Sequence, residues 1–213
     1  MPPVTSIGEP QRFEALREAI EACRICRDEP RYGPPLDHEP RPVFQLAESA
    51  RICIASQAPG IRAHRSGRPF DDPSGVRLRQ WLGLTDAEFY DASRIAILPM
   101  GFCFPGLGKT GDLPPRRECA EVWRPRVFGR LSNLKLLVVI GSYAQRWHLG
   151  HDATQQGLTE TVRAWRRHRD DTTPSVFPLP HPSWHNNRWL KLNPWFETEL
   201  LPVLQADVRA VLL

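Results

Sequence analysis

The sequence predicts an α/β fold, a three-layer α/β/α sandwich around a central, mostly parallel sheet of four strands. Four segments of strand length are apolar throughout, which is typical of strands that are buried on both faces of a parallel sheet. Segments with helical periodicity lie between them, and strands that alternate with helices favour helices packed on each side of the sheet. A single covered sheet therefore accounts for all four segments.

An expected helix precedes an irregular arm at the start of the chain. Apolar residues recur at helical spacing from residue 11 to residue 24, which predicts an amphipathic helix. The residues at this spacing are Phe13, Leu16, Ile20 and Cys23. Residues 27–42 contain five prolines, too many for a helix or a central strand. We therefore expect this stretch to lie as an irregular arm over the core.

The remaining elements alternate along the chain. The expected strands are residues 52–55, 95–98, 136–140 and 176–177. The expected helices are 76–82, 115–131, 143–149 and 158–167, followed by an amphipathic C-terminal helix from about 194 to 211.

Ligands of such sheets bind beyond the carboxyl ends of the strands. Four loops follow the strands, namely residues 56–60, 99–111, 141–143 and 181–187. The first and the last carry the most polar groups, and we expect them to form two walls of one pocket.

The composition indicates one folded domain, which we expect to span residues 1–213 with an N-terminal cysteine-containing arm, residues 1–50. The longest apolar stretch, residues 134–140, is too short to cross a bilayer, which excludes a membrane protein. The first residues lack the basic start and apolar run of a signal peptide, so we expect a cytoplasmic protein.

The charge is compatible with a polyanionic partner without requiring one. The net charge is +4 and the pI is about 9.0, an excess that proteins without such a partner also reach. The basic residues are nearly all arginines, with lysine only at positions 109, 135 and 191. Arginine suits bidentate phosphate contacts, although genome composition explains the same bias equally well.

Four of the five cysteines suggest a metal centre. Cys23 and Cys26 form a C-x-x-C pair, and Cys103 and Cys119 lie sixteen positions apart. In a reducing compartment such thiols favour a metal site over disulfides, and both zinc and an iron–sulfur cluster accept four thiolates. Four unrelated thiols, or a metal- or redox-responsive module, are the alternatives. Cys53 lies within the first expected strand and is interpreted as a buried, inert thiol.

A histidine lies on a proline-stiffened loop late in the chain. Residues 180–186 read Pro-His-Pro-Ser-Trp-His-Asn and directly follow an apolar strand-like segment. A rigid loop at the end of a strand is where α/β enzymes place chemistry, although the tripeptide His-Pro-Ser by itself is more often a plain turn than a catalytic element.

Several short motifs occur in a fixed order along the chain. Residues 21–26 contain the first cysteine pair, residues 56–60 read Ser-Gln-Ala-Pro-Gly, and residues 67–70 read Gly-Arg-Pro-Phe. Cys103 and Cys119 follow, then the apolar strand and turn at 137–144, and finally His-Pro-Ser at 181–183. In this order they resemble the uracil-DNA glycosylase superfamily, and most closely its family 4, the iron–sulfur branch.

The resemblance implies a DNA repair enzyme, a monofunctional glycosylase that hydrolyses the N-glycosidic bond of uracil or a related deaminated base and leaves an abasic site. It also implies a [4Fe–4S] cluster on the four cysteines, with zinc or no metal as alternatives, and a monomer acting on DNA that contains a damaged base. The alternative is a catalytically weak member that binds damaged or single-stranded DNA. Three features favour that alternative. Gln57 replaces the glutamate of family 4, and Pro99 stands where the family usually has an asparagine that reads uracil. Ala58, as in family 4 itself, stands where the best-known branch of the superfamily has a water-activating aspartate.

The resemblance, together with the chemistry of the residues themselves, suggests roles for individual residues. The catalytic residues are His181, which stabilises the leaving base, Gln57, which holds water, and Asp71, with Asp72 and Asp112 as alternative proton acceptors. The base-binding residues are Ala58, Pro59, Gly60, Phe70, Pro99, Ser183 and Asn186. The DNA-binding residues are Ser142, Trp184, His185 and Arg188. The metal ligands are Cys23, Cys26, Cys103 and Cys119.

Overall fold

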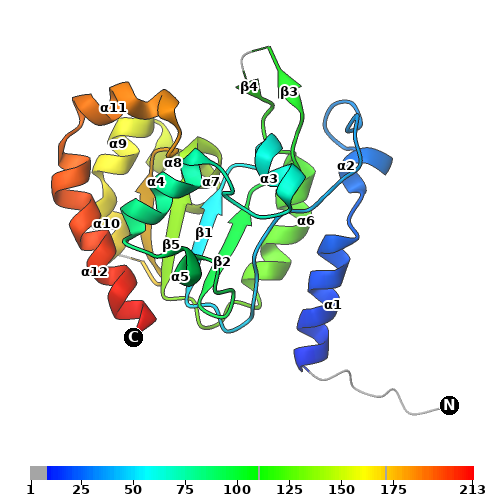
Figure 1. The fold of residues 1–213 in the computed structure, drawn as a ribbon, viewed down its shortest axis with the longest axis horizontal. Coiled ribbons are helices and arrows are strands. Elements are labelled where there is room, and N and C mark those ends of the chain that lie inside the picture. The colour runs from blue at the N-terminus through cyan, green and yellow to red at the C-terminus, as the bar shows by residue number, and fades with distance from the viewer. Residues whose placement is uncertain (1–8, 110, 171) are drawn as a thin grey trace.

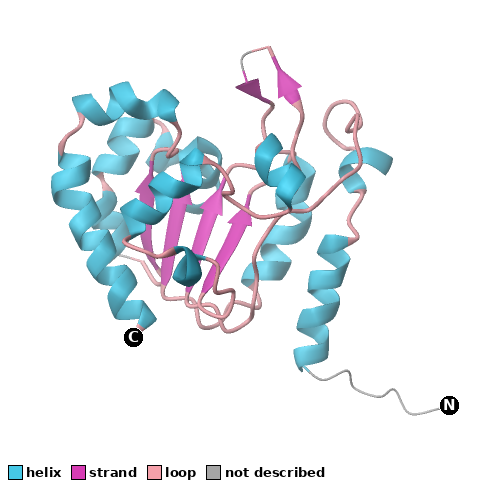
Figure 2. Ribbon diagram, viewed as in Figure 1, coloured by secondary structure: helices cyan, strands magenta, loops and turns pink. Residues whose placement is uncertain are grey.

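A four-stranded parallel sheet forms the middle layer of the molecule. The structure, a computed structural model, describes residues 9–109, 111–170 and 172–213. The strands are β1 (Ile52–Ser56), β2 (Ile95–Pro99), β5 (Leu136–Ile140) and β6 (Ser175–Leu179). They lie in the order β2-β1-β5-β6, and each neighbouring pair is parallel (Figures 1 and 2). The predicted three-layer α/β fold is confirmed.

Alternate residues of each strand face opposite sides of the sheet, as the period of two requires. On one side Cys53 and Ala55 belong to the apolar cluster that includes helices α1 (Glu9–Glu21), α6 (Arg117–Phe128) and α7 (Gly141–Leu149). On the other side Ile52 and Ile54 belong to the cluster that includes α4 (Pro73–Leu82), α10 (Trp165–Asp170) and α12 (Leu201–Leu212). Both faces of the sheet are therefore covered, which explains strands without polar positions.

Shorter elements connect these layers. The described helices also include α2 (Ile25–Asp28), α3 (Ile61–Ser66), α5 (Asp86–Phe89), α8 (His151–Thr154), α9 (Leu158–Arg163) and α11 (Asn187–Leu192). A 3₁₀ turn spans Trp184–Asn186, and a π-helical turn spans Phe196–Leu200. No helix in the described ranges is long and apolar enough to cross a membrane.

Two predicted helices are interrupted in the structure. The helix expected over 158–167 is divided at Ala164 into α9 and α10. The C-terminal helix expected over 194–211 begins with the π-helical turn before α12. Within the loop at 99–111 and just beyond it, two short strands pair as an antiparallel hairpin that the sequence did not predict, β3 (Leu107–Gly108) with β4 (Gly111–Asp112).

The irregular arm protects the outer edge of β2. Gln45 forms an antiparallel bridge with Ile97, and the amide of Val43 donates to the carbonyl of Phe102 at 2.7 Å. Exposed strand edges promote unwanted pairing between chains, and covering them is a common solution. The arm thereby also brings Cys23 and Cys26 to the loop that follows β2.

Candidate functional site

The carboxyl ends of β1, β2 and β6 surround a small cavity of about 80 Å³. Ser56 at the end of β1 lies in register with Pro99 at the end of β2, and His181 follows β6. Of the residues predicted to act on the base, six line this cavity: Ala58, Pro59, Gly60, Phe70, Pro99 and His181. The first and last sheet loops therefore do face one another.

Phe70 is held in an unusual backbone conformation beside the cavity. Its φ is +56°, a left-handed value that residues with a side chain seldom adopt. The Tyr90 hydroxyl donates to the carbonyls of Pro69 at 2.9 Å and Phe70 at 3.3 Å, and the Phe70 ring packs edge-on against Phe89. Such strain persists only where surrounding contacts maintain it, and it concentrates at functional sites. The ring is thus a fixed wall rather than a mobile side chain.

His181 presents an unpaired imidazole to the same cavity. No described residue hydrogen-bonds to its ring, whereas its carbonyl accepts from Asn186 Nδ2 at 2.7 Å. Arg77 Nη1 fixes the rest of this loop by donating to the carbonyl of Ser183 at 3.1 Å and to Asn187 Oδ1 at 2.9 Å. Burial lowers the pKa of His181, and the nearby Asp72 opposes this effect only in part. The ring is therefore neutral at pH 7 and can donate one hydrogen bond.

Two carboxylates contribute to the cavity wall. Asp72 Oδ1 caps α4 by accepting from the Ser74 hydroxyl at 2.5 Å and the Gly75 amide at 2.9 Å. Asp112 reaches the cavity from the hairpin, where burial of its carboxyl group and then the charge of Asp72 raise its pKa. Asp71 and Asp112 are both exposed residues, but Asp71 lines neither this cavity nor the groove beside it, whereas Asp112 lines both.

A wider groove of about 780 Å³ leads to the cavity. Gln57, Ser183, Trp184 and His185 line it together with His181. Trp184 is 71% exposed and stacks on the His185 ring with centroids 3.8 Å apart. Arg188 lies exposed on α11, and Asn186 braces the loop from outside the groove. Ser142 lines a different cavity.

Residues 44–205 match the sequence model of one protein family, described as the uracil DNA glycosylase superfamily. The match begins at the bridge to β2 and ends inside α12, so it includes the whole sheet and every residue of the cavity. The chain belongs to the uracil DNA glycosylase superfamily.

In this superfamily member, buried polar side chains that the sequence did not single out hold the strand ends in place. Arg124 Nη1 donates to the carbonyls of Leu98 at 3.1 Å and Pro99 at 3.2 Å, and Gln145 Nε2 donates to the carbonyl of Leu179 at 2.8 Å. Burial lowers the pKa of Arg124 to about 10. The sequence did contain a signal for Arg124, because it lies within the apolar stripe of a helix. A charged side chain that is buried there requires hydrogen-bond partners.

Ser56 is a further cavity residue without an assigned role. It is buried at the end of β1, and its hydroxyl has no hydrogen-bond partner among the described residues. Ser56 lines the cavity, where a serine hydroxyl can donate or accept a hydrogen bond. Ser56 is therefore available to a bound base on the side where Pro99 offers no side-chain hydrogen bond.

The four candidate metal ligands of this superfamily member lie together although they are distant in sequence. Cys23, Cys26, Cys103 and Cys119 line one small cavity of about 10 Å³, closed by Pro40, Pro42, Phe102 and Trp123. The amide of Phe102 donates to Cys119 Sγ at 3.2 Å, and the Trp123 indole donates to Cys23 Sγ at 3.4 Å. Hydrogen bonds to sulfur and an apolar surround are features of cysteine-ligated clusters.

Four cysteine sulfurs around one cavity are a donor set whose chemistry is compatible with a thiolate-bound metal. Burial raises the pKa of Cys26 to about 11 and that of Cys103 to about 12, and it also raises the pKa of Cys119 well above the usual value of a thiol. Without a cation these thiols are protonated at pH 7, and a bound metal reverses that by stabilising thiolates. Among the described residues, no three or more histidine, cysteine, aspartate or glutamate side chains are arranged so that they could hold a metal ion. Metal binding at the four cysteines therefore requires their sulfur atoms to move.

Proposed function

We propose that this protein is a DNA glycosylase that hydrolyses the N-glycosidic bond of uracil, or of a related deaminated base, and leaves an abasic site. The observation that carries the proposal is the unpaired, neutral His181 ring in the cavity wall shared with Phe70 and two carboxylates. Superfamily membership supports a hydrolase acting on DNA bases. A small cavity at the end of a groove suits a base that has been swung out of the helix.

The first role in this reaction is recognition of the flipped base. The Phe70 ring stacks on the base, and backbone amides of the loop at 56–60 with the Ser56 hydroxyl bond to its polar edge. Pro59 and Pro99 have no amide hydrogen and only fill space. Phe70 is held by Tyr90 and α4, so stacking requires little further ordering of the protein.

The second role is stabilisation of charge as the bond breaks. The electron pair of the bond between C1′ and the base nitrogen moves onto the base, which becomes an anion. His181 donates a hydrogen bond to a base oxygen where that charge develops, the kind of preorganised contact that contributes several kcal/mol to the barrier. Water then bonds to C1′ through its oxygen, and its proton passes to a carboxylate and finally to the base.

Asp112 is the best candidate for that carboxylate. Asp72 already accepts two hydrogen bonds on Oδ1, whereas no described residue donates to the Asp112 carboxyl group. A raised pKa makes a carboxylate a stronger proton acceptor. Gln57 holds the water from the adjoining groove, and Trp184, exposed at the groove, occupies the gap that the flipped base leaves in the helix.

A direct assay tests the proposal. The protein is incubated with an oligonucleotide that contains one uracil, and alkali then breaks the strand at abasic sites. Strand breaks at the uracil position are expected, and replacing the uracil by thymine is expected to abolish them. Binding without breaks would favour the alternative of a catalytically weak DNA-binding member, which Pro99 in the cavity wall motivates.

Replacing Asp112 by asparagine should separate catalysis from stability. We expect kcat/KM to fall about 100-fold, within the usual contribution of a general base. In the wild type kcat/KM should rise with pH through the raised pKa of Asp112, because only the ionised form accepts a proton. The acid limb should disappear in Asp112→Asn, and pH profiles of the two proteins check this.

The same variant has an opposite expected effect on folding. The folded state holds the Asp112 proton to higher pH than the unfolded chain, so stability falls as pH rises from the unfolded pKa through the raised one. Above that window the charge disfavours the fold, and Asp112→Asn should melt no lower than wild type at pH 7. A variant that melts lower and keeps its activity would show that Asp112 is structural.

We further propose that the protein is of the family 4 type and that the four clustered cysteines bind a [4Fe–4S] cluster, which joins the N-terminal arm to α6 and takes no part in the reaction. Anaerobic purification should give a brown protein with about four iron atoms per chain. Cys26→Ala should lose the iron and melt at a lower temperature.

Cys53 provides the matched control, because it is fully buried within β1 and lies outside the cysteine cavity. Cys53→Ala should retain iron, as measured by metal analysis and visible absorbance. A colourless protein containing zinc, or iron retained in Cys26→Ala, would contradict the cluster assignment.

A further inference from the structure

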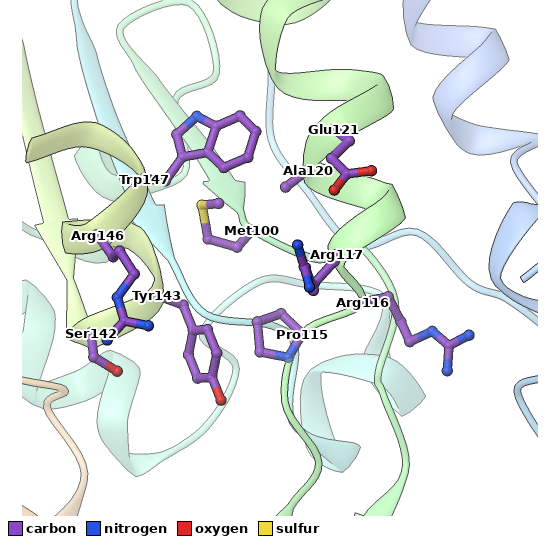
Figure 3. A pocket seen from close by; sticks show the side chains of 10 residues that line it. All are labelled: Met100, Pro115, Arg116, Arg117, Ala120, Glu121, Ser142, Tyr143, Arg146 and Trp147. Atoms are coloured by element: carbon purple, nitrogen blue, oxygen red, sulfur yellow. The ribbon is translucent and has the colours of Figure 1, made fainter. Parts of the chain in front are cut away.

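A second cavity, about 850 Å³ in volume, lies next to the base cavity and has no role in the mechanism above. It lies between α6 and α7 (Figure 3). Met100 forms part of its lining, directly after Pro99 of the base cavity, and the Met100 amide donates to the carbonyl of Ser56 at 2.8 Å. The ends of β1 and β2 therefore separate the two cavities.

Two aromatic side chains line the cavity with their surfaces partly open to solvent. Tyr143 is 41% exposed and Trp147 is 44% exposed. They lie four residues apart on α7, so they share one face of that helix. Neither the Tyr143 hydroxyl nor the Trp147 indole nitrogen has a hydrogen-bond partner in the described part of the chain. Exposed aromatic rings beside a cavity offer stacking surfaces for flat ligands.

The side chains that line the cavity also carry a net positive charge. Arg146 of α7 has no ion pair within the described ranges, and Arg117 of α6, which has none there either, lies over the Tyr32 ring, 4.5 Å from its centroid. Arg116 is already neutralised by Glu118. The lining carboxylate Glu121 accepts hydrogen bonds from the Tyr32 hydroxyl and keeps its negative charge, so it offsets one of the two remaining arginines. Figure 3 shows Arg146 and Tyr143 on one side and Arg117 on the other, with Met100 and Pro115 between them.

We infer that this cavity binds an unpaired nucleotide of the DNA strand that carries the damaged base. The base of that nucleotide stacks on the aromatic face formed by Tyr143 and Trp147 together, and its phosphate binds Arg146 and Arg117, since guanidinium groups favour phosphate oxygens. The volume is that of a ligand site rather than of a packing defect. This inference depends on the proposed function in one respect only, namely that the substrate of the protein is DNA.

This site implies a preference for single-stranded DNA. In a duplex the neighbouring bases are paired and stacked on one another, so they are not free to enter a second cavity. In a single strand they enter without breaking base pairs. The tighter complex is therefore expected with a single strand, whereas duplex DNA engages only the groove and the base cavity.

Fluorescence anisotropy with a labelled, undamaged thymidine oligonucleotide tests the inference, with the same strand in a duplex for comparison. Trp147→Ala and Tyr143→Ala should each weaken single-strand binding by roughly 5- to 100-fold, the range that loss of one stacked base produces, and change duplex binding little. Trp147→Phe and Tyr143→Phe keep a ring and should bind nearly as wild type. Melting curves verify that each variant is folded.

The arginine is tested through salt dependence. Arg146→Ala should reduce the slope of log K against log salt by about 0.7 for the single strand, as loss of one phosphate contact predicts. Arg167→Ala removes an exposed arginine of α10 and should leave the slope unchanged.

Several outcomes would overturn the inference: unchanged single-strand binding in folded Trp147→Ala, equal weakening for single strand and duplex, or competition by thymidine monophosphate as effective per nucleotide as the oligonucleotide. The assay uses no damaged base and no catalysis. If the protein excises no uracil, the proposed function fails while this binding result still stands on its own.

Discussion

A His181→Ala variant is expected to excise uracil about 10²- to 10³-fold more slowly than the wild type, as measured by the rate constant of excision under single-turnover conditions. This is the usual effect of removing one hydrogen-bond donor aimed at developing negative charge. His181 is the one imidazole in the cavity wall, and its ring bonds to none of the described residues, so its donor is available to a ligand. The contact strengthens as the base gains charge, so kcat should fall more than KM rises.

Two comparisons distinguish this role from a structural one. His181→Gln keeps a neutral donor near the same place and should recover part of the lost rate. Asn186→Ala removes the bond to the His181 carbonyl and should reduce activity less, because it only loosens the loop. All three variants should melt within a few degrees of the wild type. Full activity in His181→Ala would rule out the proposed mechanism.

The sheet could be predicted from the sequence because nearly all residues of its strands share one environment, the buried apolar core. Every residue of β1, β2 and β5 is buried, so continuous apolar runs identified them without tertiary information. The same reasoning placed the carboxyl-end loops at one edge, and six of the predicted base-binding and catalytic residues do line one cavity. Whether these residues act as predicted stays a prediction.

The details of the site depended on geometry that no short pattern contains. Asp71 and Asp72 are adjacent in sequence, but α4 begins immediately after Asp72, and capping turns that carboxylate toward the cavity while Asp71 remains exposed. Asp112 reaches the cavity through a hairpin of two-residue strands, too short for any periodicity. The left-handed backbone conformation of Phe70 could not be predicted from the sequence either, because it results from contact with α4, the helix that follows Phe70 in the chain.

That contact leads to the second large effect, which we expect from Gly75→Ala. Gly75 lies in the first turn of α4, where alanine is normally the better helix former by about 0.5–1 kcal/mol. Here a Cβ would stand 1.8 Å from the carbonyl oxygen of Phe70, far inside contact distance and against backbone rather than a flexible side chain. Either α4 or Phe70 must move, and overpacking of this kind costs about 1–3 kcal/mol or more.

The displacement of α4 or Phe70 should lower base binding as well as the stability of the fold. Phe70 keeps its left-handed conformation through α4 and Tyr90, so shifting its carbonyl turns the ring away from the base. We expect Gly75→Ala to unfold at lower urea concentration and to lose uracil binding, measured by urea titration and by KM. Gly129→Ala is the matched control, because Gly129 has an ordinary helical φ of −63° and should tolerate alanine within about 1 kcal/mol. Wild-type stability and KM in Gly75→Ala would mean that close packing of α4 does not hold the Phe70 ring in place.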